Sequence, residues 1–124
     1  MHYAIRSNKT TALFDLSDRL SLFAETLGFN YETGGYYPPW EFKENSELQT
    51  AYITVYEEML GSKIKVEAIH AGLECAVFAD KLADLDCIAI GPSLFDVHTA
   101  NERMEVASVE KVYNLVVKLL ASLK

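Results

Sequence analysis

The stretch DCIAIGPSLFDVHTANERM, residues 86–104, is the part of the sequence that most directly predicts the fold. Residues 86–90 are nearly all apolar, which is typical of a strand in the middle of a sheet that is covered on both faces. Gly91-Pro92 then opens a loop, since proline cannot donate a hydrogen bond to a strand ladder. In open α/β sheets, binding sites gather after the carboxyl ends of such strands. The loop that begins at Gly91 is therefore a candidate binding site.

His98 lies in the middle of this loop, and Glu102 and Arg103 close it, near enough to brace the loop or each other. A loop histidine is in most proteins a solvated or hydrogen-bonded surface residue. Alternatively, a neutral imidazole in this position binds zinc or a similar metal through one nitrogen while an acceptor holds the other. Spacing alone leaves both interpretations open.

Working outward, strands and helices alternate along the chain, which predicts an α/β fold. Pro38-Pro39 ends the first strand-helix-strand unit. Apolar periodicity predicts strands over residues 2–6, 29–37, 64–69 and 86–90, and helices over 13–27, 46–60, 73–82 and from 108 to the C-terminus.

Local end signals support the helices. Gly28 and Gly61 are expected C-terminal stops, Ser46 and Gln49 form a capping-box pattern, and Ser108 is the expected cap of the last helix. The apolar faces expected to point inward are Leu13, Leu16, Leu20, Phe23 and Leu27 on the first helix, Leu48, Tyr52, Val55 and Met59 on the second, and Val109, Val112, Val116, Leu119 and Leu123 on the last.

Composition excludes some classes of partner and compartment. The 124 residues carry 11 basic and 18 acidic side chains, for a net charge of −7, so a nucleic-acid backbone is not an expected partner. Cys75 and Cys87 are expected to be free thiols in a reducing compartment. No signal peptide and no membrane-spanning run is visible, so we expect a cytoplasmic protein without a membrane partner.

Four further positions have both a structural and a functional interpretation. Gly72 marks either a tight turn or a place where the backbone approaches a ligand. His70 and Glu74 are close to it in the sequence. They either hold the residues of a site in place without contacting the ligand, or form a local hydrogen-bonded pair. Arg6 is either solvated or a bidentate clamp for a carboxylate.

Several stretches together resemble one enzyme family: VEAIHAGLEC (66–75), LDCIAIGPSLFDVHTANER (85–103) and SVEKVYNLVVKLL (108–120), with AIRSN (4–8) and GGYYPPW (34–40) in the same order. They are similar to the C-terminal part of the M20-type metallopeptidases, in the branch of the Xaa-His dipeptidases. The resemblance implies that residues 1–40 are the strand-helix-strand end of a lid and dimerisation domain. Residues 41–124 would then be the C-terminal part of a mixed α/β zinc-peptidase catalytic domain.

The same resemblance implies roles for individual residues. His98 corresponds to a metal ligand of the family, Arg6 to the lid arginine that holds the substrate carboxylate, and Gly72 to a glycine lining the substrate pocket. Supporting roles would fall to His70, Glu74 and Glu102, which would hold these residues in place without contacting the metal or the substrate. Ala76, and Ala100-Asn101 before Glu102, depart from the usual pattern.

The family binds two zinc ions, and most of its ligands lie in a part that this sequence does not match: an H-x-D motif, a bridging aspartate, a Glu-Glu pair and a further aspartate. Glu57-Glu58 lies on the polar side of a predicted helix and does not replace that pair. We therefore expect at most one zinc ligand and no catalytic residue here. The interpretation is a C-terminal portion of a zinc-dependent dipeptidase acting on Xaa-His or other dipeptides, inactive by itself.

The alternative is a non-catalytic interaction module derived from the peptidase. It would form homo-oligomers through the lid strands or through edges that truncation exposes.

Overall fold

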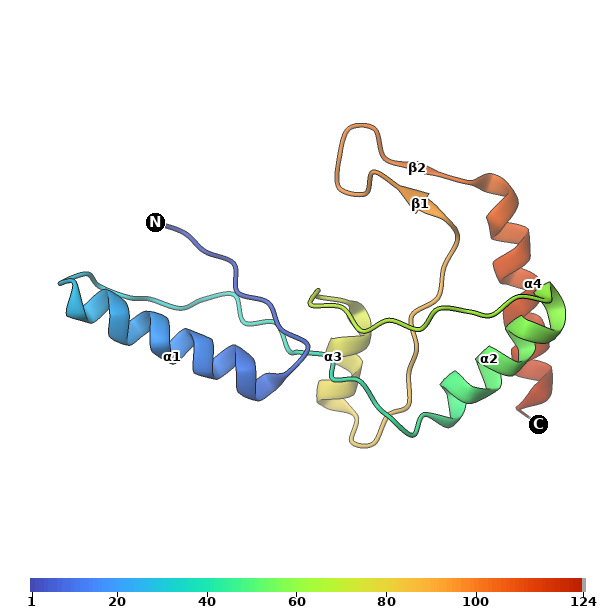
Figure 1. Ribbon diagram of the computed structural model, residues 1–124, viewed down its shortest axis with the longest axis horizontal. Coiled ribbons are helices and arrows are strands. Elements are labelled where there is room, and N and C mark those ends of the chain that lie inside the picture. Colours follow the sequence, from blue (N-terminus) through green and yellow to red (C-terminus); the bar gives the residue numbers. More distant parts are fainter. Residues whose placement is uncertain (124) are drawn as a thin grey trace. The chain divides into compact units, whose positions relative to one another are not determined.

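The structure, a computed structural model, describes residues 1–123 and contains four helices and one pair of strands over that range (Figure 1). The elements are α1 (Thr10–Thr26), α2 (Glu47–Leu60), α3 (Glu74–Lys81), β1 (Leu94–Phe95), β2 (Arg103–Met104) and α4 (Val106–Ser122). Two compact units share the chain. Unit 1 comprises residues 1–44 and 66–85, and unit 2 comprises residues 45–65 and those from Asp86 onward.

Unit 2 is organised by the packing of α2 against α4 (Figure 1). Tyr52 and Val55 of α2 are buried against Leu115 and Leu119 of α4. Partly buried apolar residues surround them, including Leu48, Met59, Ile64 and Ile88. The inward face predicted for α2 is therefore confirmed.

The start and end of α2 follow the local signals. The Ser46 hydroxyl accepts a hydrogen bond from the Gln49 amide at 2.9 Å, as the capping-box pattern predicts. The Asp86 carboxylate accepts a second one, from the Leu48 amide at 3.0 Å. Gly61 ends the helix with a φ of 64°, a left-handed conformation that costs glycine little.

The last helix differs from its prediction in two respects. It begins at Val106, so Ser108 is not its cap but lies inside the first turn, buried. The inward face is also rotated: Leu115, absent from the predicted face, is 2% exposed, whereas Val109 and Leu123 are exposed. Among the helices and strands of residues 1–123, α4 packs against α2, and Leu115 and Leu119 are the α4 residues buried in the cluster shared with α2.

Unit 1 contains α1, which spans nearly the range predicted and is followed by Gly28 at a φ of 76°. None of its residues is buried. Leu16, Phe23 and Leu27 of the predicted inward face are exposed. In this unit the apolar periodicity identified the helix, but it did not identify a core.

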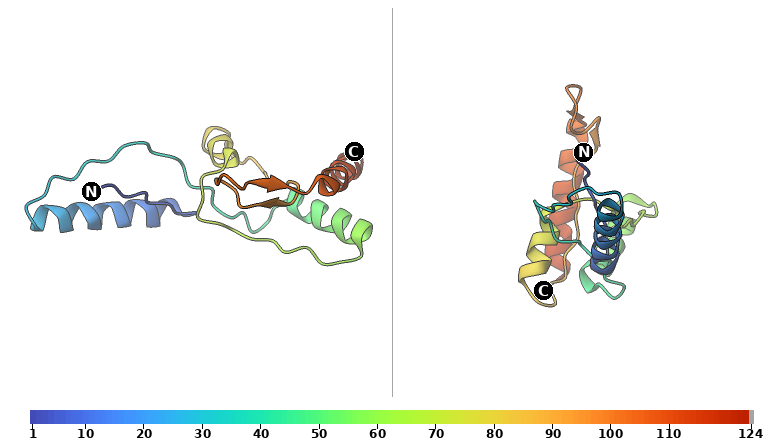
Figure 2. Two further views of the ribbon diagram at one scale, coloured as in Figure 1. Left: turned by 90° about the horizontal axis from the view of Figure 1, so that it is seen from above. Right: turned by 90° about the vertical axis from the view of Figure 1, so that its left-hand side faces the viewer.

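The four predicted strands, over residues 2–6, 29–37, 64–69 and 86–90, are not strands of the structure. Over residues 1–123 the sheet consists of β1 and β2, which pair antiparallel as Leu94 with Met104 and Phe95 with Arg103 (Figure 2). Apolar alternation predicts an extended backbone, but a strand also needs a continuous hydrogen-bonded neighbour, which the pattern does not specify. The division into lid and catalytic domains at residue 40 stays a prediction, because compact units within this chain do not identify the domains of a longer relative.

Candidate functional site

The His98 loop is the turn of the β1–β2 hairpin. Asp96 and His98 adopt positive φ angles of 51° and 66°, which are uncommon for residues with a side chain and need support from their surroundings. Thr99 supplies part of it, because its hydroxyl donates to the Asp96 carbonyl at 2.7 Å and accepts from the Asn101 amide at 3.1 Å. Hydrogen bonds between residues of the turn itself therefore stabilise its conformation.

Glu102 and Arg103 brace the same turn. The Glu102 carboxylate accepts a hydrogen bond from the His98 amide at 2.8 Å. The Arg103 guanidinium pairs with the Asp96 carboxylate and lies 5.0 Å from the centre of the Phe95 ring, in a cation–π arrangement. The loop is thus braced as predicted, and His98 is presented on it in an exposed position.

A buried serine connects the hairpin to α4. The Ser108 hydroxyl donates to the Glu105 carbonyl at 2.6 Å and accepts from the Ser93 amide at 2.8 Å. The Glu105 amide in turn donates to the Ser93 carbonyl at 2.9 Å. These bonds fix the base of the hairpin, so the position of His98 depends on Ser108.

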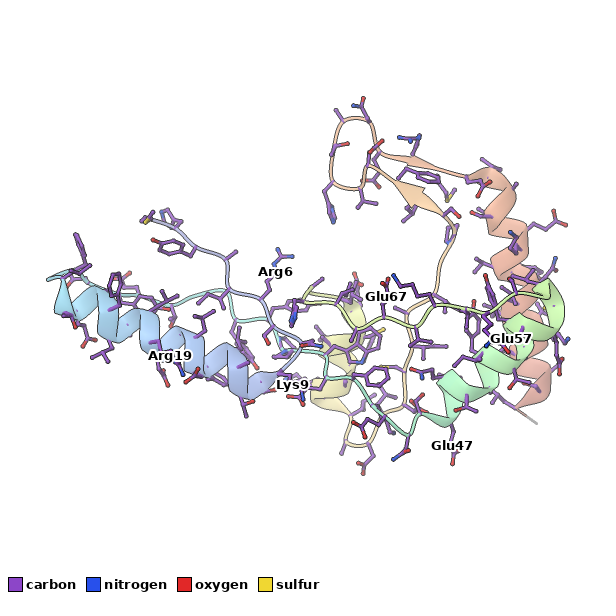
Figure 3. The ribbon with its side chains drawn as sticks, in the orientation of Figure 1. Arg6, Lys9, Arg19, Glu47, Glu57 and Glu67 are labelled. Atoms are coloured by element: carbon purple, nitrogen blue, oxygen red, sulfur yellow. The ribbon has the colours of Figure 1, made fainter. Side chains whose placement is uncertain are left out.

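Arg6, His70, Gly72 and Glu74 all belong to unit 1. Arg6 is exposed on the segment that precedes α1, and Figure 3 shows its side chain pointing away from that helix. Arg6, Ala71 and Gly72 line one hollow together with residues of α1 and of the segment that follows it. The structure thus brings Arg6 and Gly72 to the same hollow.

His70 is hydrogen-bonded to a residue far away in the sequence. Its Nδ1 accepts from the Asn8 amide at 3.0 Å. The hydrogen-bond partner of His70 Nδ1 is therefore Asn8 and not the neighbouring Glu74. Glu74 lies in the first turn of α3, where the negative charge of a carboxylate interacts favourably with the positive end of the helix dipole.

Gly72 has a close neighbour that the sequence did not reveal. A Cβ at this position would lie 3.2 Å from Cδ1 and Cε1 of the Tyr37 ring, tighter than ordinary van der Waals contact. A side chain at this position would therefore crowd the Tyr37 ring, which gives a packing reason for a glycine here. Tyr37 and Asn8 are the two residues that sequence reasoning missed, and neither carries a local signal, because the contacts join segments more than 30 residues apart.

Zinc requires several ligands around one point, and the residues of this chain do not provide them. Over residues 1–123 no three side chains among His, Cys, Asp and Glu gather closely enough to hold a metal ion. His98 and His70 belong to different units. These residues by themselves therefore do not fit a metal centre.

The side chains of Cys75 and Cys87 are both partly buried. Within the described range, 1–123, no helix has both the length and the apolar character needed to cross a membrane.

The chain is similar to a curated dipeptidase and to a dipeptidase of known structure. The chain is 28% identical over 120 residues to the cytosol non-specific dipeptidase of Escherichia coli (strain K12), an alignment that covers 97% of this chain and 25% of that protein. The crystal structure of aminoacylhistidine dipeptidase from Vibrio alginolyticus superposes with a TM-score of 0.79 at 28% identity, covering 94% of this chain and 24% of the other. No protein-family model matches the sequence.

The structural match agrees with the α/β class expected from the sequence. The chain spans about a quarter of the length of each relative. Over that span, the chain is homologous to these two dipeptidases.

Proposed function

We propose that this chain performs the part of dipeptide hydrolysis that the corresponding quarter of a metallodipeptidase performs, and that it does not hydrolyse peptides by itself. The alignment with the Escherichia coli dipeptidase carries the proposal, since it covers 97% of this chain but 25% of that enzyme. The substrate class is dipeptides, including those with a C-terminal histidine, as the names of the two relatives suggest. A cytoplasmic location is part of the same proposal.

Two contributions follow from the geometry. The hairpin presents His98 in a fixed backbone conformation, so that its imidazole can serve as one ligand of a zinc site completed by groups outside this chain. Arg6 offers a planar fork of donors in a hollow that Gly72 also lines, which suits the terminal carboxylate of a dipeptide.

A chimera tests the proposal. The matching segment of the Escherichia coli dipeptidase is replaced by this chain, and hydrolysis of a Xaa-His dipeptide is assayed with zinc. We expect the chimera to be active and the chain alone to be inactive.

In the chimera, His98→Ala should lower kcat/KM by about 100-fold or more. Mutating even a residue that only hydrogen-bonds to a metal ligand lowers metal affinity or activity by about 10- to 100-fold. Val97→Ala is the control, because Val97 is an exposed neighbour of His98 on the same turn and its side chain cannot bind a metal. Turnover by the pure chain, or equal activity of the His98 and Val97 variants, would contradict the proposal.

The second candidate is a non-catalytic module that forms homo-oligomers. It is favoured by the exposed apolar side chains of α1, among them Leu16, Leu22 and Phe23, which are 45%, 67% and 63% exposed. Light scattering of the purified chain tests it. A dimer that persists after metal chelation and is lost in the Leu16→Ser/Phe23→Ser variant would support this function.

A further inference from the structure

The turn formed by residues 69–73 is tied to two other parts of unit 1 by contacts of different kinds. On one side, His70 Nδ1 accepts the hydrogen bond from the Asn8 amide at 3.0 Å. On the other side, the Tyr37 ring occupies the space that a side chain at Gly72 would enter, 3.2 Å from where its Cβ would lie. The turn is therefore the point where the first ten residues and the segment after Gly35 meet residues from the second half of the chain.

We infer that His70 and Tyr37 are positioning residues for the carboxylate-binding hollow, an inference that rests on the proposed function. Arg6 lies two residues before Asn8, so its Cα is within about 8 Å of the Asn8 Cα. The Asn8–His70 hydrogen bond therefore limits how far Arg6 moves from Gly72. Neither His70 nor Tyr37 needs to touch the substrate for this role.

The hydrogen bond also determines which nitrogen of His70 carries the proton. Nδ1 can accept only when it is unprotonated, so the neutral ring carries its proton on Nε2. An Asn side chain has an acceptor oxygen at nearly the position of Nδ1, whereas a Phe side chain has none. His70→Asn and His70→Phe thus form a matched pair that separates the hydrogen bond from the packing.

The Tyr37 contact gives a different explanation of Gly72 from the one that the resemblance implies. If glycine is required because the Tyr37 ring occupies the neighbouring space, removing the ring should restore tolerance to a side chain. If glycine is required because substrate approaches the backbone, removing the ring should not help. The variants Gly72→Ala and Gly72→Ala/Tyr37→Ala distinguish the two.

NMR of the purified chain tests the geometry without any activity. We expect the Nε2–H tautomer at His70 and a ring-current shift of the Gly72 Hα signals that disappears in Tyr37→Leu. We also expect an Asn8 amide shift that changes in His70→Phe but is kept in His70→Asn. A His70 ring protonated on Nδ1, or Gly72 signals that are indifferent to Tyr37, overturns the inference.

The chimera supplies the functional readout. We expect His70→Phe to raise KM roughly three- to tenfold, as one lost hydrogen bond allows, with kcat nearly unchanged, and His70→Asn to retain the parent KM. We expect the double variant Gly72→Ala/Tyr37→Ala to recover most of the KM lost in Gly72→Ala. A double variant as impaired as Gly72→Ala, or equal KM values for the two His70 variants, overturns the inference. An inactive chimera counts against the proposed function, while the NMR result decides the positioning on its own.

Discussion

The two compact units of this protein are stabilised in different ways. In unit 2, α2 and α4 bury an apolar cluster of Tyr52, Val55, Leu115 and Leu119. In unit 1, α1 has no buried residue, and polar contacts connect it to its surroundings. The difference shows that an amphipathic pattern is sufficient for a helix but not for a core, which also needs a second apolar face.

The contacts of α1 illustrate the second kind of stabilisation. The Thr10 amide at its start donates to the Glu41 carboxylate at 2.8 Å, and the Ser17 hydroxyl is hydrogen-bonded to Tyr31 at 3.1 Å. Such contacts contribute little individually when they are exposed. We therefore expect the amides of α1 to exchange with solvent faster than those of α2 and α4.

The largest expected effect is on the apolar cluster. Leu115→Ala removes a side chain that is 2% exposed and should destabilise the protein by about 2–5 kcal/mol, because it loses burial and leaves a cavity. Phe23→Ala on α1, where the ring is 63% exposed, should change stability by less than about 0.5 kcal/mol. Urea unfolding followed by circular dichroism measures both. Equal losses in the two variants would mean that the apolar face of α1 is covered in solution.

A smaller effect is expected where unit 2 uses a polar contact. Ser108→Ala leaves the Ser93 amide without its acceptor and should cost about 1–3 kcal/mol. Hydrogen exchange should show faster exchange at Ser93 and in the β1–β2 hairpin, and weaker zinc retention should follow in the active chimera.

The control for this variant is Ser122→Ala at the other end of α4. The Ser122 hydroxyl donates to the Leu119 carbonyl three residues earlier, as Ser108 does to Glu105. The same change there should leave hairpin exchange unaltered. Unchanged exchange in Ser108→Ala as well would contradict the anchoring role.

The smallest effect concerns the start of α1. The hydrogen bonds from Thr10, first from its backbone and then from its side chain, hold the pKa of Glu41 below its ordinary value of 4.5. The charged form is therefore favoured in the folded state, so its contribution is complete above about pH 4.5 and is lost as the pH falls through the lowered pKa. Since the carboxylate is exposed, we expect no more than about 1 kcal/mol, as for a helix cap.

Glu41→Gln keeps an acceptor oxygen but removes the charge, so exchange at the start of α1 should become independent of pH between pH 3 and 6. In the parent chain, the rate of amide hydrogen exchange at the start of α1, corrected for its intrinsic pH dependence, should increase as the pH is lowered. Glu32→Gln, at another exposed acid of unit 1, should behave as the parent does. A parent profile without this change would show that Glu41 does not cap α1 in solution.

The site was predictable where its signals are close together in the sequence. The loop signals around His98 indicated a braced turn, and Glu102 contacts His98 four residues away. The contact between Asn8 and His70 was not predictable, because 62 residues separate them and neither residue type requires the other. Gly72 illustrates both cases: its place in a turn could be predicted, whereas its neighbour Tyr37 could not.

The sequence alone determined the helices and most of their ends, since backbone hydrogen bonds within a helix and caps such as Ser46 and Gly61 act over a few residues. Only the tertiary structure decided which extended segments are strands, which face of α4 is buried and which residues surround Arg6. Each of these depends on a partner distant along the chain, and the residues of one segment do not specify which other segment will pack against it.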